Sequence, residues 1–101
     1  MLKSKEVRLT PKAISDLENI YRYSHREFGQ IKAERYIRCI DAALNKLADF
    51  PQLGIHYFHL AKDLMGYKVE SHIVFYRVRH DVISVLRVLH KSMDYAEYIP
   101  G

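Results

Sequence analysis

The sequence predicts an α+β protein in which a helical hairpin packs on a small antiparallel sheet, in the order β-α-α-β-β-β. Two long stretches in the first half repeat apolar residues every three or four positions, and one glycine separates them. The last third is instead rich in β-branched and aromatic residues, in runs bounded by short polar turns. One short alternating stretch precedes the first helical pattern, and it supplies the leading strand.

The leading strand covers residues 6–10, where polar and apolar side chains alternate. A helix begins directly after it, because Thr10 is a good N-cap and Pro11 suits the first helical position. Apolar residues then keep a helical spacing from Ala13 to Phe28, and Gly29 is expected to end the helix.

The second helix is expected to begin at about Gln30 and to end before Pro51, since proline disfavours helix at the residue that precedes it. Two amphipathic helices joined across one glycine predict an αα-hairpin. Cys39 lies beside the apolar stripe of this helix, and we assign it a structural role.

Residues 51–66 lack a clean period and contain two glycines, so they predict a loop. A short strand is expected over 67–70 and stronger strands over 72–79 and 82–90. The turn at 79–81 makes the last two strands an antiparallel hairpin, and the last strand, apolar on both faces, suits the centre of the sheet. The tail from residue 92 has no predicted element.

Length and composition fit one domain, residues 1–101, with 49% hydrophobic residues, which excludes a disordered chain. No apolar run approaches the roughly 20 residues of a membrane span, and the first residues do not form a signal peptide. We therefore expect a cytoplasmic protein. The formal net charge of +4 permits an acidic partner without requiring one.

No strong catalytic or cofactor motif is present, and we expect no cofactor. His56 and His59 are three residues apart and lie near Asp63, but the loop offers no convincing third and fourth metal ligand. We therefore interpret these histidines as surface residues and predict no metal site.

Basic residues are concentrated in the predicted sheet. Arg77 and Arg79 share one face of their strand, and Arg87 interrupts an otherwise apolar strand. A sheltered arginine needs a partner, for which Asp94, Glu97 or a carboxylate of another protein could serve. An internal ion pair, without any functional role, explains Arg87 equally well.

These basic side chains could also cleave RNA. His90 ends the last strand near Tyr95, and a histidine, arginines and a tyrosine can supply acid-base chemistry at a phosphate. An obvious general base on the sheet is missing, so this enzymatic interpretation is incomplete.

The segments SHIVFYRV and VLRVLHKSMD (71–78 and 85–94) closely resemble the carboxyl half of ParE toxins, in the RelE/ParE superfamily of type II toxin–antitoxin systems. The earlier segments AISDLENIYRYSHREFG and AERYIRCIDAALNKLADFPQLG are similar to the helical hairpin of that family. The resemblance covers nearly the whole chain, and its specific part is the ending RVLHKSMD.

The resemblance implies a non-enzymatic toxin that inhibits DNA gyrase, through its A subunit, and thereby blocks replication in a bacterial or archaeal cytoplasm. It implies a hetero-oligomer with a ParD-like antitoxin, whose flexible arm wraps the toxin. Sequence-specific nucleic-acid binding is expected only from that complex. Two alternatives stay open: a RelE-like ribosome-dependent mRNA endonuclease using Arg77, Arg87 and His90, and an inactive toxin kept only as an antitoxin partner.

Under this resemblance, the last strand and the tail are the candidate surface for gyrase, and exposed apolar side chains with arginines are the candidates for the antitoxin. The candidate gyrase-contact residues are Arg87, His90, Lys91, Ser92, Met93 and Asp94. The candidate antitoxin-contact residues are Tyr21, Phe28, Leu53, Tyr57, Phe58, Arg77 and Arg79. A structural role, in which His90 and Asp94 tie the tail to the sheet, is the alternative for those two residues.

Overall fold

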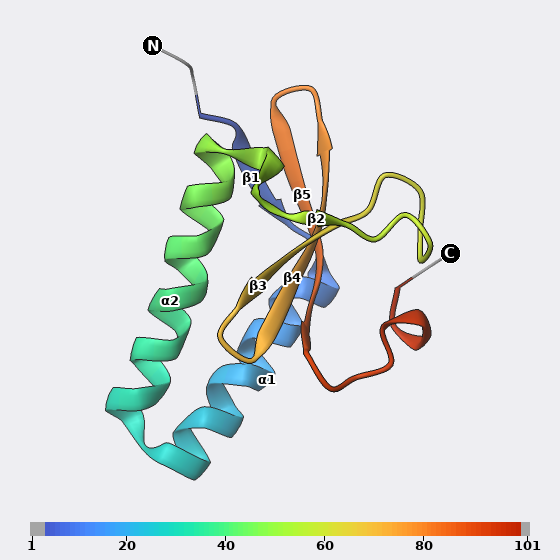
Figure 1. The fold of residues 1–101 in the computed structure, drawn as a ribbon. Helices are drawn as coiled ribbons and strands as arrows, with labels where there is room; N and C mark the ends of the chain where they lie inside the picture. The colour runs from blue at the N-terminus through green and yellow to red at the C-terminus, as the bar shows by residue number, and fades with distance from the viewer. Residues whose placement is uncertain (1–3, 100–101) are drawn as a thin grey trace.

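The computed structural model of the chain describes residues 4–99, which form two long helices against one sheet (Figure 1). The helices are α1 (Pro11–Phe28) and α2 (Gln30–Asp49). The strands are β1 (Glu6–Leu9), β2 (Ile55–His56), β3 (Met65–Val69), β4 (His72–Arg79) and β5 (Val82–His90). Residues 1–3 and 100–101 of the predicted domain lie outside the described residues.

The helix boundaries predicted from the sequence are confirmed. The Thr10 hydroxyl accepts a hydrogen bond from the Ala13 N–H at 3.1 Å, so Thr10 is the N-cap of α1. Gly29 separates the helices with φ of +88°, a backbone conformation that glycine adopts most readily. Helix α2 ends at Asp49, two residues before Pro51.

The five strands lie in the order β1-β5-β4-β3-β2. The predicted β4–β5 hairpin is confirmed, and β5 lies inside the sheet rather than at its edge, as predicted. The expectation of a purely antiparallel sheet is wrong, because β1 is parallel to β5. The helical hairpin and the rest of the sheet separate these two strands along the chain, so no tight turn forces them to be antiparallel.

The predicted loop over 51–66 contains a 3₁₀ turn (Pro51–Leu53) and the two-residue strand β2. Strand β2 pairs antiparallel with the start of β3, which begins at Met65, two residues before the predicted start. Two residues are too few for an alternating pattern to be visible in a sequence.

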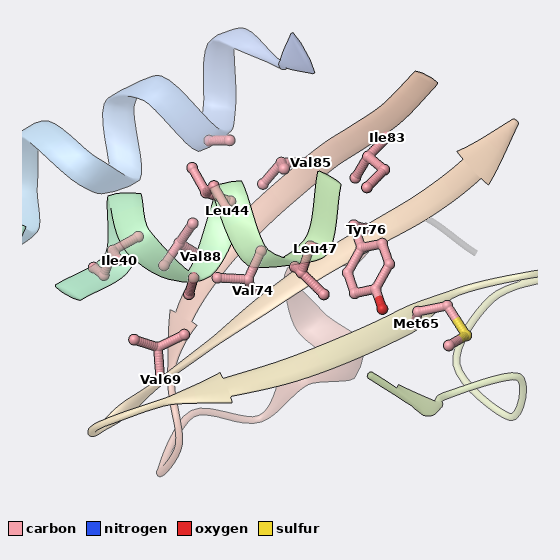
Figure 2. Close-up of a cluster of buried hydrophobic side chains, with 12 residues drawn as sticks. Ile40, Leu44, Leu47, Met65, Val69, Val74, Tyr76, Ile83, Val85 and Val88 are labelled. Atoms are coloured by element: carbon pink, nitrogen blue, oxygen red, sulfur yellow. The ribbon is translucent and has the colours of Figure 1, made fainter. Parts of the chain in front are cut away.

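The main core fills the space between α2 and the sheet (Figure 2). Ile40 and Leu47 of α2 face Val74 and Tyr76 of β4, and all four side chains are buried. The hydroxyl of Tyr76 donates to the Pro51 carbonyl at 2.7 Å and accepts from the Gly54 N–H at 3.0 Å, so the loop after α2 is tied to the sheet.

A second core lies on the other face of the sheet. Figure 1 shows the loop before β3 and the tail after β5 on this side, away from the helices. Phe75 of β4 packs there against the rings of Tyr57 and Tyr95, with centroids 5.1 Å away in both cases. The tail after β5, which carried no sequence prediction, forms a 3₁₀ turn (Tyr95–Glu97) and buries Ile99 in this cluster. Within residues 4–99, no helix is long and apolar enough to cross a membrane.

Candidate functional site

A groove of about 950 Å³ separates the helical hairpin from the ends of β4 and β5. Its apolar lining comes from both sides, with Ile20, Tyr23 and Phe28 on α1 and Leu89 and Met93 on β5 and the tail. Tyr23 and Phe28 are more than half exposed. Exposed aromatic rings beside a groove are typical of a binding surface for another protein.

Arg87 forms an ion pair with Asp16 of α1 at one wall of the groove. Its Nε lies 2.8 Å from Asp16 Oδ2 and its Nη2 lies 2.9 Å from Asp16 Oδ1, a two-pronged arrangement. Both side chains are largely buried, at 15% and 13% exposed. The prediction that Asp94 or Glu97 pairs with Arg87 is therefore wrong, because α1 crosses beside β5 and places Asp16 at the guanidinium.

Asp16 also completes the edge of β5. The pairing with β1 ends at Val85, and β5 bulges at Leu86, which has no partner in β4. Beyond that point, the Thr10 hydroxyl donates to the Leu86 carbonyl at 2.8 Å, and Asp16 Oδ2 accepts from the Val88 N–H at 2.9 Å. The start of α1 thus satisfies backbone groups that β1 is too short to reach.

Arg87 extends the same network to the tail. Its Nη1 donates to the Tyr98 carbonyl at 3.2 Å, and its guanidinium lies 5.6 Å from the centre of the Tyr98 ring. The hydrogen bonds that Arg87 donates to Asp16 raise the pKa of Arg87 above its ordinary value. Arg87 therefore joins α1, β5 and the tail, which is the internal ion pair that the sequence left as its alternative.

A polar cluster forms part of the wall of the groove. His72 and His90 lie opposite each other in the β4–β5 register, with ring centroids 5.2 Å apart. The hydroxyl of Tyr36 lies 2.6 Å from His72 Nδ1 and accepts from the Ser71 N–H at 3.0 Å. Burial and the neighbouring His90 lower the pKa of His72 to about 4, so its ring is neutral at pH 7.

The candidate gyrase-contact residues divide into two groups. Arg87, His90 and Met93 line the groove. Lys91, Ser92 and Asp94 are exposed on the turn that follows β5. His90 Nδ1 is bonded to Ser92, at 2.7 Å from its hydroxyl and 3.1 Å from its N–H, so it is Ser92 and not Asp94 that ties this histidine to the turn.

The candidate antitoxin-contact residues do not gather on one surface. Among them, Phe28 lines the groove, while Tyr21 lines a smaller hollow with Leu17 and Ile37. Leu53 and Phe58 are exposed on the loop before β3, and Tyr57 is partly buried in the second core. Arg77, which donates to the Lys62 carbonyl at 2.9 Å, and the exposed Arg79 lie on the face of the sheet away from the helices.

The three residues of the RNase alternative are likewise not assembled. Arg87 and His90 line the groove, but Arg77 does not. The groove instead brings in Asp16, Tyr36 and His72, which were not predicted as site residues. Asp16 had one detectable signal, since it lies three residues after Ala13 and four before Ile20, on the edge of the apolar stripe. Among the described residues, no group of three metal-ligating side chains converges.

Comparison with known proteins identifies close sequence relatives. Residues 7–95 match the family model described as ParE toxin of type II toxin-antitoxin system, parDE. Toxin ParE1 of Caulobacter vibrioides is 36% identical over 90 residues, which cover 89% of this chain and 93% of that protein. Toxin ParE1 of Mycobacterium tuberculosis is 33% identical over 92 residues, 90% of this chain and 94% of that one.

Solved structures share the fold. A chain of the chromosomal ParDE TA system from P. aeruginosa matches with a TM-score of 0.75 and 21% identity, over 86% of this chain and 96% of that chain. A chain of the toxin-antitoxin complex RelBE2 from Mycobacterium tuberculosis matches with a TM-score of 0.57 and 21% identity, over 88% and 100% of the two chains. The architecture predicted from the sequence is thus that of known toxin–antitoxin structures.

Proposed function

This chain belongs to the ParE toxin family of type II toxin–antitoxin systems, and we propose that it inhibits DNA gyrase and is neutralised by direct binding of a ParD-like antitoxin. The observation that carries the proposal is the family match over residues 7–95, which spans both helices and all five strands except the first residue of β1. Both interactions would take place in the cytoplasm, where gyrase acts.

The groove supports an antitoxin partner. Exposed Tyr23 and Phe28 form an apolar wall, and exposed Lys32 and Arg35 of α2 lie at its rim. This combination suits an amphipathic segment with an apolar face and acidic residues beside it. We therefore place the antitoxin arm in the groove.

The exposed turn after β5 supports a separate contact with gyrase. Lys91, Ser92 and Asp94 project from it, and the hydrogen bond from the Lys91 N–H to the Ser71 carbonyl, 2.8 Å, fixes its position. The ion pair of Arg87 with Asp16 and the hydrogen bond that the Ser92 N–H donates to His90 support this turn. In this proposal, Arg87 and His90 position the contact surface.

A supercoiling assay tests the proposed target. The purified chain is added to active gyrase, and supercoiling and trapped cleaved DNA are followed on a gel, with the antitoxin as control. We expect inhibition that the antitoxin relieves. Lys91→Glu should weaken inhibition, whereas Lys12→Glu, the same charge change on the exposed first turn of α1, should leave it intact. An active gyrase that is unaffected by the chain contradicts gyrase as the target.

Substitutions of two exposed phenylalanines test where the antitoxin binds. Phe28 is 59% exposed in the groove, and Phe58 is 52% exposed on the loop before β3. Phe28→Ala should weaken antitoxin binding, and Phe58→Ala should not, although both remove the same exposed ring. The reverse result would place the antitoxin arm on the loop.

The mRNA endonuclease alternative is tested with the same preparations. Translating ribosomes are incubated with the chain, and transcripts are examined for cleavage. Because Arg77 lies away from the groove and Arg87 is held by Asp16, we expect no cleavage. Cleavage that His90→Ala abolishes would favour the endonuclease instead.

A further inference from the structure

His72 and His90 form a pair in the wall of the groove. They lie on neighbouring strands, at the start of β4 and the end of β5, and their rings are nearly perpendicular at 87°. Both line the groove together with Tyr36. The pair is therefore available to any segment that enters the groove.

The hydrogen bonds at Nδ1 define where each ring carries its proton. The Tyr36 hydroxyl accepts from the Ser71 N–H, which leaves its own hydrogen to be donated to His72 Nδ1. The Ser92 N–H donates to His90 Nδ1. A neutral imidazole that accepts at Nδ1 carries its proton on Nε2. Both rings thus present an Nε2–H donor.

Neither donor has a partner among the described residues. No hydrogen bond joins either Nε2 atom to a described residue, and none of the buried side-chain nitrogens or oxygens in residues 4–99 lacks a partner. Both Nε2 atoms are therefore at least partly exposed, and both side chains line the groove. Two N–H donors on adjacent strands match an acceptor with two oxygens, such as a carboxylate.

We propose that His72 and His90 together bind the carboxylate of one aspartate or glutamate in the antitoxin arm. This inference rests on the proposed function, because it assigns a chemical role to the polar wall of the proposed antitoxin groove. It explains why a largely apolar groove keeps two histidines whose Nδ1 atoms are already bonded, while their Nε2 atoms have no partner in the described chain.

The charges around the pair favour a peptide carboxylate over a nucleic-acid phosphate. Arg87 is already paired with Asp16, and the turn between β3 and β4 places Glu70 on the groove. Among residues 4–99, the other cationic side chains that line the groove are those of Lys32 and Arg35. A nucleic-acid backbone requires several free basic side chains in a row, whereas one carboxylate requires only local donors.

Two kinds of amide substitution distinguish the contributions of the two ring nitrogens to binding. In His72→Asn and His90→Asn, the amide oxygen takes the place of Nδ1 as acceptor, but nothing replaces Nε2–H. In the matched controls His72→Gln and His90→Gln, an N–H donor reaches near the Nε2 position. Affinity for the ParD-like antitoxin should fall by about ten- to a hundredfold in the double Asn variant, the range for a hydrogen-bonded charged group. The double Gln variant should retain most of it.

A glutamine or asparagine scan of the acidic residues in the antitoxin arm completes the test. One substitution should weaken binding to the wild-type chain and have no further effect on the double Asn variant, which identifies the bound carboxylate. Wild-type chain gives a second readout: the Nε2 proton signals of both histidines should shift when antitoxin binds. Unchanged signals overturn the inference even if a variant fails to fold.

The outcomes separate this inference from the proposed function. Unchanged antitoxin affinity in the double Asn variant, with a loss in Phe28→Ala, overturns the histidine site and leaves the antitoxin groove in place. A wild-type chain that does not bind the antitoxin overturns both. A single-stranded RNA oligonucleotide that competes with the antitoxin, and whose own binding depends on the two histidines, would assign the pair to phosphate and overturn the carboxylate.

Discussion

The carboxylate of Asp16 connects three parts of the molecule. It holds the Arg87 guanidinium at two points, accepts the Val88 N–H of β5, and through Arg87 reaches the Tyr98 carbonyl of the tail. Burying the two charges of an ion pair costs desolvation free energy. Removing one partner therefore leaves the other charge buried without compensation. At this scale, a single side chain determines whether a buried arginine and a strand edge remain satisfied.

Asp16→Ala should therefore lower the free energy of unfolding by about 2–4 kcal/mol, because it leaves Arg87 without its partner and Val88 N–H without an acceptor. Urea denaturation measures the change. The control is Glu6→Ala, which breaks the exposed pair of Glu6 with Arg8 and should cost less than about 1 kcal/mol. Equal costs for the two variants would show that the Asp16 pair adds nothing to stability.

The pH dependence of stability contains a contribution from His72. Its pKa is lowered from 6.5 to about 4 in the folded chain, by burial and by His90. Between these values the unfolded chain binds a proton that the folded chain excludes, so the free energy of unfolding falls as the pH is lowered from 6.5 to 4. For a ring that is only half buried, this contribution is about 1 kcal/mol after allowance for solvent screening.

His72→Asn keeps an acceptor for the Tyr36 hydroxyl but does not titrate. Urea midpoints measured at pH 7 and at pH 4.5 should therefore fall less in this variant than in the wild-type chain. Comparing the change in midpoint between the two chains removes the contributions of the other titrating groups, which both chains share. An equal change in midpoint for the variant and the wild-type chain would mean that His72 is protonated equally in the folded and unfolded chains.

At the scale of elements, the local signals of the sequence were sufficient for the helices. Thr10, Gly29 and Pro51 mark their ends, and each acts through the backbone of its own neighbourhood. Contacts between distant elements were not predictable in this way. Asp16 and Arg87 are 71 residues apart, and their pairing depends on how α1 crosses the edge of β5 beyond the end of β1.

The candidate site was likewise predictable where the signal was local and not where it depended on contacts between distant elements. Arg87 and His90 were identified because charged or polar residues stand out in an apolar strand, but their partners were not. Tyr36 lies on α2, for which the sequence predicted only an amphipathic helix, and only the packed structure directs its hydroxyl to His72. The parallel pairing of β1 was missed because strand direction across a long connection leaves no local trace.

The α1–α2 hairpin depends on one residue. Gly29 has φ of +88° and ψ of +170°, a combination that is essentially restricted to glycine, and a Cβ there would meet no atom within 4 Å. Gly29→Ala should therefore cost about 1–3 kcal/mol of stability through backbone strain alone. Thermal unfolding measures it against Gln30→Ala, an exposed helical neighbour that should be nearly neutral. A neutral Gly29→Ala would show that the hairpin tolerates another turn.

For the whole molecule, the net charge of +4 is less informative than its distribution. Two pairs of basic residues lie on different sides of the fold, Lys32 and Arg35 at the groove and Arg77 and Arg79 on the opposite face of the sheet. Neither pair forms an ion pair with a described residue. Each is therefore free to attract an acidic antitoxin arm from a different direction.

Charge reversal on each pair distinguishes these directions. The double variants Lys32→Glu with Arg35→Glu and Arg77→Glu with Arg79→Glu lower the net charge by the same amount, so any difference between them reports location. If the arm enters the groove, stopped-flow association with the antitoxin should slow by about tenfold in the first variant at low salt and much less in the second. The difference should shrink as salt is raised, because screening shortens the range of the attraction. A larger effect from the Arg77 and Arg79 variant would move the antitoxin arm to the outer face of the sheet, where the tail and the second core would be its neighbours.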